Sequence, residues 1–142
     1  MTSHPPSRPV ASGLLLPVAG DPVRAGFPSP ADDYLDDSIS LDAYLIADPA
    51  ATFLVRVRGD SMSGAGIGEG DLLVVDKGLT ANHGDIVIAI VDGEFTVKRL
   101  HNLRGRCALI AENPAYPPIT LCPGQELQVW GVVTGAVKKF RR

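Results

Sequence analysis

Asp92-Gly93 lies between two apolar runs, residues 85–91 and 94–100, and this arrangement is the strongest short-range signal for a β-hairpin. Other short apolar or alternating runs surround the hairpin, with glycine- or proline-containing segments between them. These runs cover residues 52–58, 72–75, 107–111 and 127–133. Many short strands joined by such turns predict an antiparallel, mainly β domain.

The N-terminal part of the chain has a different character. Residues 1–30 are rich in proline, which interrupts the periods of helices and strands. We therefore expect an extended arm over 1–30, without helix or strand, followed by the β domain over 31–142. Ser40 is a candidate helix N-cap, and the apolar residues after it predict a short helix over 40–47 that ends before Asp48-Pro49. One or two short helices are thus expected near the start of the β domain.

Lys98 is out of place on the second strand of the hairpin. A two-residue turn puts Val87 opposite Lys98 and Ala89 opposite Thr96. Because side chains alternate between the faces of a strand, these four residues share one face. The neighbours are apolar or small and cannot pair with an ammonium, so burial is expected to lower the pKa of the lysine. The alternative is that Lys98 extends into water at a sheet edge.

Ser61 is the second candidate, in the run Gly59-Asp60-Ser61-Met62 that follows a predicted strand. A serine hydroxyl is a weak nucleophile until a base takes its proton, and a neutral lysine amine can act as that base. Such a pair would hydrolyse an acyl bond without a histidine. The alternative is an ordinary turn, since glycine, aspartate and serine are all frequent there.

Other catalytic arrangements find no support in the sequence. The hydrolase motif G-x-S-x-G requires a glycine at position 63, where Ser63 stands. His4, His83 and His101 have no clear acidic partner, so a Ser-His-Asp triad is not expected. The glycine-rich segment 64–70 departs from the dinucleotide-binding pattern. No cluster with metal-ligand spacing is present, so neither a metal nor a cofactor is expected.

Composition excludes further classes. The net charge of −3 offers no basic field for gripping a phosphate backbone, so sequence-specific DNA binding is not expected. Cys107 and Cys122 have no C-x-x-C partner and lie in apolar surroundings, which predicts free thiols and a cytoplasmic location. No apolar run reaches the roughly 18 residues of a membrane-spanning helix, so no membrane anchor is expected.

Several blocks of the chain match the pattern of one known family. They include Gly59-Asp60-Ser61-Met62 and the strand that contains Thr96-Val97-Lys98-Arg99. Further matching blocks are residues 70–76, 83–89, 113–119 and 131–133. With these blocks in this order, the chain resembles the LexA/UmuD family of self-cleaving serine peptidases from about Gly26 to the C-terminus. The resemblance implies a LexA/signal-peptidase-like antiparallel β domain.

The resemblance also implies roles for individual residues. Ser61 would be the nucleophile and Lys98 the general base, with the backbone N–H groups of Ser61 and Asp60 as oxyanion donors. The scissile bond would be Ala25–Gly26 in the arm. Only 25 residues precede that bond, too few for the helix-turn-helix domain of a LexA-type repressor. The chain therefore resembles the shorter, UmuD-like branch of the family.

The partners of that branch are implied in the same way. They are a second copy of the chain in a homodimer, a RecA filament on single-stranded DNA that stimulates the cut, and a UmuC-type translesion DNA polymerase subunit. The alternative is a non-catalytic dimeric binding module for a polymerase, whose arm another protease removes. A membrane signal peptidase with similar chemistry is disfavoured because no anchor segment is seen. Whether cleavage occurs within one chain or between two remains open.

Overall fold

The structure is a computed structural model that describes residues 14–20, 35–121 and 127–141. Contacts within the chain group it into two units, Met1–Ala47 and Asp48–Arg142. The predicted limits of the arm, 1–30, and of the β domain, 31–142, stay a prediction. Each unit is described by itself below.

The described residues of the first unit form a two-stranded antiparallel sheet and one helix. Strand β1, Leu16–Ala19, pairs with β2, Leu35–Ile39. Helix α1, Leu41–Leu45, begins after Ser40, whose Oγ accepts a hydrogen bond from the N–H of Ala43 at 3.3 Å. The predicted helix and its N-cap are therefore confirmed. The prediction that no strand forms before residue 30 is wrong, because both strands of a two-stranded sheet are edges and an edge tolerates proline.

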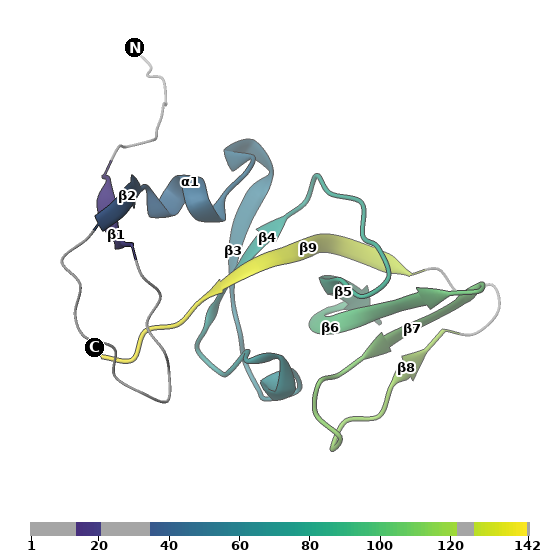
Figure 1. The fold of residues 1–142 in the computed structure, drawn as a ribbon. Coiled ribbons are helices and arrows are strands. Elements are labelled where there is room, and N and C mark those ends of the chain that lie inside the picture. The colour runs from purple at the N-terminus through teal and green to yellow at the C-terminus, as the bar shows by residue number, and fades with distance from the viewer. Residues whose placement is uncertain (1–13, 21–34, 122–126, 142) are drawn as a thin grey trace, which may run out of the picture. The chain divides into compact units, whose positions relative to one another are not determined.

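The second unit is an antiparallel seven-stranded sheet (Figure 1). Its strands follow the order β3-β4-β9-β5-β6-β7-β8, and every adjacent pair is antiparallel. The strands are β3 (Thr52–Arg56), β4 (Leu72–Asp76), β5 (Ile86–Val91), β6 (Glu94–Leu103), β7 (Arg106–Ile110), β8 (Ile119–Thr120) and β9 (Gln128–Val137). Two 3-10 turns accompany them, η1 (Pro49–Ala51) and η2 (Ser63–Ala65). The mainly β, antiparallel fold predicted from the sequence is confirmed.

The β5–β6 hairpin has the predicted register. Val91 pairs with Glu94 across the Asp92-Gly93 turn, and Val87 pairs with Lys98. Asp92 and Gly93 take φ of 51° and 80°, the left-handed values that the tightest hairpin turns require. β6 continues past the hairpin to Leu103 and pairs there with β7.

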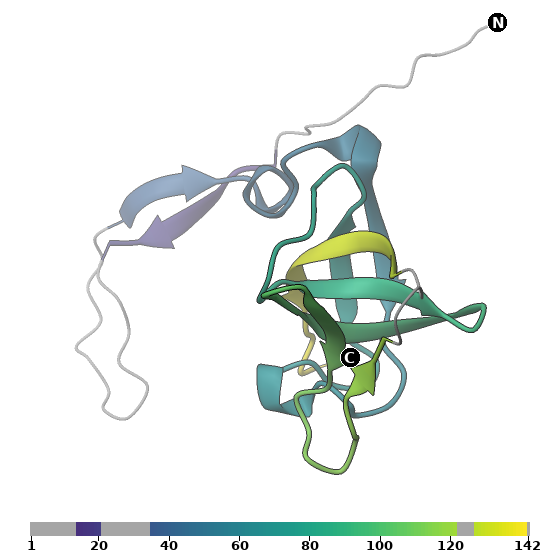
Figure 2. The same ribbon diagram turned by 90° about the vertical axis from the view of Figure 1, so that its right-hand side faces the viewer.

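Successive side chains of β5 point to opposite faces of the sheet and pack in two apolar clusters. Ile88 packs in one cluster with residues of β4, and Val87 and Ala89 pack in the other with Leu100 and Leu109. Strand β9, yellow in Figures 1 and 2, pairs with β4 on one side and β5 on the other. Its register shifts once against each neighbour, and such bulges bend a strand and increase its twist.

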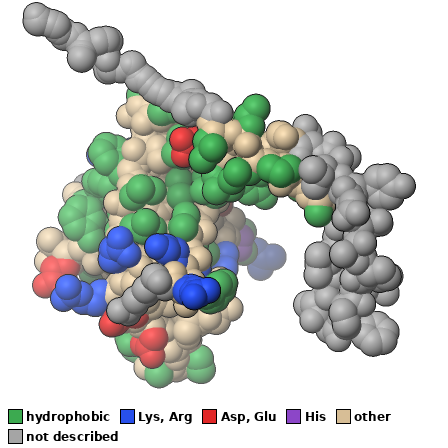
Figure 3. Space-filling model, turned by 90° about the vertical axis from the view of Figure 1, so that its left-hand side faces the viewer, with side chains coloured by type: hydrophobic (Ala, Val, Ile, Leu, Met, Phe, Trp, Pro, Cys, Tyr) green, Lys and Arg blue, Asp and Glu red, His purple; other side chains and the backbone are tan. Residues whose placement is uncertain are grey.

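Hydrophobic side chains also reach the surface, as the green atoms of Figure 3 show. On the second unit, Phe53, Leu54 and Phe95 are about half exposed or more, at 46%, 59% and 62%. Within the described residues, no helix is both long and apolar enough to span a bilayer.

Candidate active site

Ser61 lies in the turn that follows β3. The chain leaves the sheet after Val57, whose N–H donates to the carbonyl of Asp71 at 2.9 Å. Gly59 then takes φ of +90°, a conformation that glycine adopts without steric cost. Met62, directly after the serine, is 1% exposed and packs in the first apolar cluster. This buried side chain anchors the turn, so the neighbouring hydroxyl is held at a defined place.

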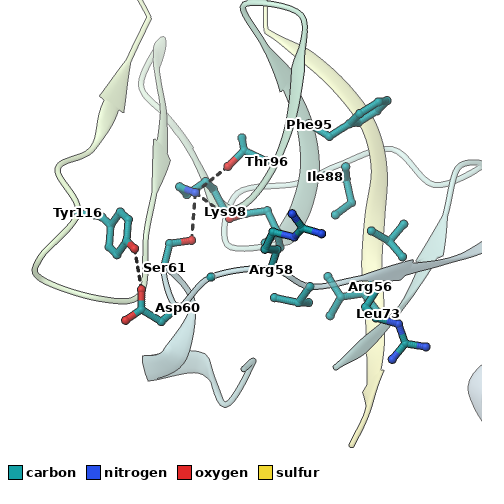
Figure 4. A pocket seen from close by; sticks show the side chains of 14 residues that line it. Arg56, Arg58, Asp60, Ser61, Leu73, Ile88, Phe95, Thr96, Lys98 and Tyr116 are labelled. Carbon is teal, nitrogen blue, oxygen red and sulfur yellow. Dashed lines mark hydrogen bonds between the residues drawn. The ribbon is translucent and has the colours of Figure 1, made fainter. Parts of the chain in front are cut away.

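Lys98 projects from the middle of β6 toward that hydroxyl (Figure 4). The residue is only 8% exposed. Its Nζ lies 3.1 Å from Ser61 Oγ, 2.7 Å from Thr96 Oγ1 and 3.1 Å from the carbonyl oxygen of Val97. All three contacts are neutral oxygens, so the amine is hydrogen-bonded but meets no negative charge.

Burial lowers the pKa of Lys98 below its ordinary value, because desolvation penalises the charged ammonium. No ion pair joins Lys98 to a carboxylate in the described parts of the chain. One expectation needs correction: the neighbours on its face were predicted to be unable to pair with an ammonium, yet the Thr96 hydroxyl accepts a hydrogen bond from Nζ. The correction leaves the direction of the shift unchanged, because a hydroxyl carries no charge.

A cavity of about 300 Å³ opens beside the two side chains. Figure 4 shows Ser61, Lys98 and Tyr116 toward one end, while Leu73 and Phe95 lie toward the other. One end is therefore polar and reactive, and the other combines apolar contact with the guanidinium of Arg56. Such a lining suits a ligand whose apolar part is buried while a few polar groups fix its orientation.

The loop after β7 holds the nucleophile turn through backbone contacts. The N–H of Glu112 donates to the Ser61 carbonyl at 2.9 Å, and the N–H of Gly64 donates to the Glu112 carbonyl at 2.7 Å. A Cβ added to Gly64 would lie 2.5 Å from that carbonyl oxygen, so only glycine allows this approach. Arg99, next to Lys98 in sequence, pairs with the Glu112 carboxylate at 3.1 Å. The strand of the lysine and the turn of the serine are thus tied to the same loop.

Asp60 receives two side-chain contacts from the same loop. Asn113 Nδ2 donates to the carbonyl of Asp60 at 3.0 Å, and the Tyr116 hydroxyl donates to its Oδ1 at 2.6 Å. This hydrogen bond and the nearby negative charge raise the pKa of Tyr116, since both favour the protonated phenol. Tyr116 therefore stays a donor at neutral pH and tethers the residue before Ser61.

The structure brings together some of the predicted site residues. Ser61 and Lys98 are in hydrogen-bonding contact, and Asp60 adjoins them. Among the described residues, the backbone N–H groups of Asp60 and Ser61 donate to no acceptor, which leaves both available to a bound group. Ala25 and Gly26 lie outside the described residues, so the predicted scissile bond stays a prediction.

Histidines and metals have no visible part in this site. None of the residues that line the cavity is a histidine, and His83 and His101 instead stack edge to face on each other. Within 14–20, 35–121 and 127–141, no three His, Cys, Asp or Glu side chains gather as metal ligands do. Cys107 is a free thiol, and Cys122 lies outside the described residues.

Sequence reasoning missed four contributors: Thr96, Glu112, Asn113 and Tyr116. The last two belong to a block that matched the family pattern, Asn113-Pro114-Ala115-Tyr116, but the match assigned no role to either side chain. Thr96 shares a strand face with Lys98, which was a usable signal for a hydroxyl contact. Nothing local in the sequence indicated that Glu112 would meet the nucleophile turn.

The arrangement is suited to acyl transfer. A hydroxyl and a desolvated amine at 3.1 Å are within the reach that proton transfer requires. Two free N–H groups beside the hydroxyl could stabilise the negative oxygen of a tetrahedral intermediate. The geometry therefore supplies a nucleophile, a base and candidate oxyanion donors in one wall of a cavity.

Comparison with known proteins agrees with this chemistry. A family model described as Peptidase S24-like matches residues 17–134. Protein SamA of Salmonella typhimurium is 53% identical over 137 residues, which cover 96% of this chain and 94% of SamA. Protein ImpA of Escherichia coli is 46% identical over 141 residues, covering 97% of this chain and 94% of ImpA. LexA repressor 1 of Geobacter sulfurreducens is 43% identical over 125 residues, but these span only 61% of the repressor.

Proposed function

We propose that this chain, which belongs to the Peptidase S24-like family and to its UmuD-like SOS-mutagenesis branch, cuts itself between Ala25 and Gly26. Family membership makes it a serine peptidase of the self-cleaving kind. The Ser-Lys pair and the site of the cut are the proposed part. The observation that carries the proposal is the 3.1 Å contact between Lys98 Nζ and Ser61 Oγ, in a site where no carboxylate of the described residues pairs with the amine.

The proposed reaction begins with proton transfer from Ser61 to the neutral amine of Lys98. Oγ attacks the carbonyl carbon of Ala25 and forms a tetrahedral intermediate. The amide C–N bond then breaks, and the nitrogen of Gly26 leaves with the proton that Lys98 carries. Water hydrolyses the resulting ester with Lys98 again as base, which releases the carboxylate of Ala25 and restores Ser61.

The backbone N–H groups of Ser61 and Asp60 are proposed to donate to the oxyanion of the intermediate. Their freedom from acceptors among the described residues supports this role. A donor placed for the charged oxygen is worth about 10²–10³ in rate in serine peptidases. The tethered substrate adds a high effective concentration, so a slow pair of residues can suffice for one cut per chain.

The biological role follows from the branch of the family. The relatives place the chain among UmuD-like SOS-mutagenesis proteins. We propose that a RecA filament on single-stranded DNA stimulates the cut in the cytoplasm. We further propose that the shortened chain forms a homodimer and serves as accessory subunit of a UmuC-type translesion polymerase.

The competing proposal is a dimeric polymerase-binding module whose arm another protease removes. Ser61→Ala and Lys98→Ala distinguish the two, with Lys139→Ala as the matched control because Lys139 is an exposed lysine away from the cavity. Purified chains are incubated at pH 10 and analysed by mass spectrometry. Self-cleavage predicts a fragment starting at Gly26 from the wild type and the control only. The competing proposal predicts that all four purified chains stay intact, and undiminished cleavage of both Ser61→Ala and Lys98→Ala would also contradict self-cleavage.

A further inference from the structure

The peptide group between Asp60 and Ser61 is held from one side. Its carbonyl oxygen accepts two hydrogen bonds, one from the N–H of Ser63 at 3.2 Å and one from Asn113 Nδ2 at 3.0 Å. The first arises within the turn itself. The second comes from a residue 53 positions further along the chain, so it ties the turn to a separate loop.

The direction of that carbonyl determines the direction of the Ser61 N–H. The peptide bond is trans, and in a trans peptide the C=O and N–H bonds lie in one plane and point in opposite directions. Fixing the oxygen toward Asn113 therefore aims the N–H of Ser61 away from Asn113. In the described part of the chain this N–H of the half-buried Ser61 has no acceptor, so it is free to donate to a bound group.

Asn113 is itself oriented by its own loop. Its Oδ1 accepts a hydrogen bond from the N–H of Ala115 at 3.0 Å, which identifies the other amide atom as the donor Nδ2. The backbone carbonyl of Asn113 accepts from the N–H of Tyr116 at 3.0 Å. Pro114 restricts the backbone between them. The donor is thus presented by a short, internally bonded loop.

We infer that Asn113 is a positioning residue for the proposed oxyanion site. It holds the Asp60–Ser61 peptide plane so that the N–H of Ser61 faces the oxygen on which charge develops. The inference rests on the proposed self-cleavage and adds to it a residue that does not touch the reacting atoms. It also excludes a direct role for Asn113 in proton transfer, because its contacts go to Asp60 and to its own loop.

Two substitutions test the inference together. Asn113→Ala removes both side-chain hydrogen bonds without adding charge, and Asn113→Asp keeps the acceptor for Ala115 but loses the donor. Only the bond to the Asp60 carbonyl is lost in both. We expect both chains to cleave themselves about 10- to 100-fold more slowly than the wild type, less than the full effect of deleting an oxyanion donor. The pH midpoint of the Asn113→Ala rate should stay that of the wild type, because Lys98 is untouched.

Tyr116→Phe removes another hydrogen bond between the same two loops, to the Asp60 side chain, and leaves the peptide carbonyl bonded. Because Tyr116 lines the cavity, we expect some loss of rate, but a smaller loss than in Asn113→Ala. Asn102→Ala is the matched control, because Asn102 is an exposed asparagine outside the cavity lining, and its rate should stay within about threefold of the wild type. A loss in Tyr116→Phe as large as that in Asn113→Ala would overturn the inference, because it would mean that any tether between the loops matters equally. A shifted pH midpoint in Asn113→Ala would also overturn it, since the lysine would then have moved.

A second measurement does not depend on turnover. In a chain carrying Ser61→Ala, the amide ¹⁵N and ¹H resonances of residue 61 should shift more in Asn113→Ala than in Tyr116→Phe, and unchanged resonances would contradict the inference. Failure of the inference about Asn113 is distinguishable from failure of the proposed function. Wild-type rates in both Asn113 variants would overturn the inference alone. Absence of Ser61-dependent cleavage in the unmodified chain would overturn the proposed function and the inference with it.

Discussion

Replacing Lys98 by methionine should make the protein more stable at neutral pH and less dependent on pH. Methionine keeps most of the length of the lysine stem and removes the amine. Both chains also carry Ser61→Ala, so that neither can cleave itself at high pH. The chain with Ser61→Ala alone is called the parent. The parent retains a lysine that is only 8% exposed and whose pKa is lowered by burial.

The magnitude follows from proton linkage. Between the lowered pKa of Lys98 and the ordinary value of 10.5, the unfolded parent binds one proton that the folded parent does not. Its free energy of unfolding therefore rises with pH in that window, with a limiting slope of about 1.4 kcal/mol per pH unit. Below the lowered pKa and above 10.5 this contribution is flat. The methionine chain lacks the group and so lacks the slope.

Urea unfolding followed by the fluorescence of Trp130, the single tryptophan, measures the difference at intervals from about pH 6 to 11. The loss of a hydrogen-bond donor to the Thr96 hydroxyl adds a cost that does not change with pH, so the slope isolates the titration. We expect the free energy of unfolding of the parent to rise relative to that of the methionine chain as pH rises toward 10.5. A difference between the chains that is constant over the whole range would refute a desolvated Lys98.

Three further predictions concern the surroundings of the site. Thr96→Val removes a neutral acceptor 2.7 Å from the site lysine, which favours the uncharged amine, so the pH–rate profile of self-cleavage should move to lower pH; an unmoved profile counts against this contact. Gly64→Ala places a Cβ 2.5 Å from the carbonyl oxygen of Glu112 and should cost about 1–3 kcal/mol in urea unfolding, whereas wild-type stability would show that the loops can separate freely. The pKa of Asp71 is lowered, first by a backbone hydrogen bond from Gly68 and then by Lys138. The carboxylate therefore stabilises the folded protein above about pH 4, and this contribution is lost as pH falls through the lowered pKa. Asp71→Asn should not show this loss of stability when unfolding is measured at low pH. The same pH dependence in Asp71→Asn and in the wild type would disprove the role of Asp71.

The local part of the fold could be predicted from the sequence because its cause is local. A two-residue turn at Asp92-Gly93 leaves one register for the hairpin, and that register alone put Val87 opposite Lys98. The helix start at Ser40 was predictable for the same reason, since one side chain satisfies one nearby N–H.

Contacts between distant segments could not be predicted in this way. The pairing of β1 with β2 joins runs that carry no strand period, and proline at position 17 argued against one. Asn113 and Asp60 are 53 residues apart, and the ion pair of Lys138 with Asp71 spans 67 residues. Such pairings depend on how the sheet folds back, which turn chemistry alone does not specify.

The central claim is that Ser61 and Lys98 cut this chain at Ala25–Gly26, and intact-mass measurement across pH tests it most directly. Purified chain is incubated from about pH 7 to 11, and the mass and N-terminus of each product are determined over time. The account predicts one cut, a product that begins at Gly26, and a rate that rises with pH as the amine of Lys98 loses its proton and then levels off. A chain that stays intact at every pH, or a product that begins elsewhere, would contradict it.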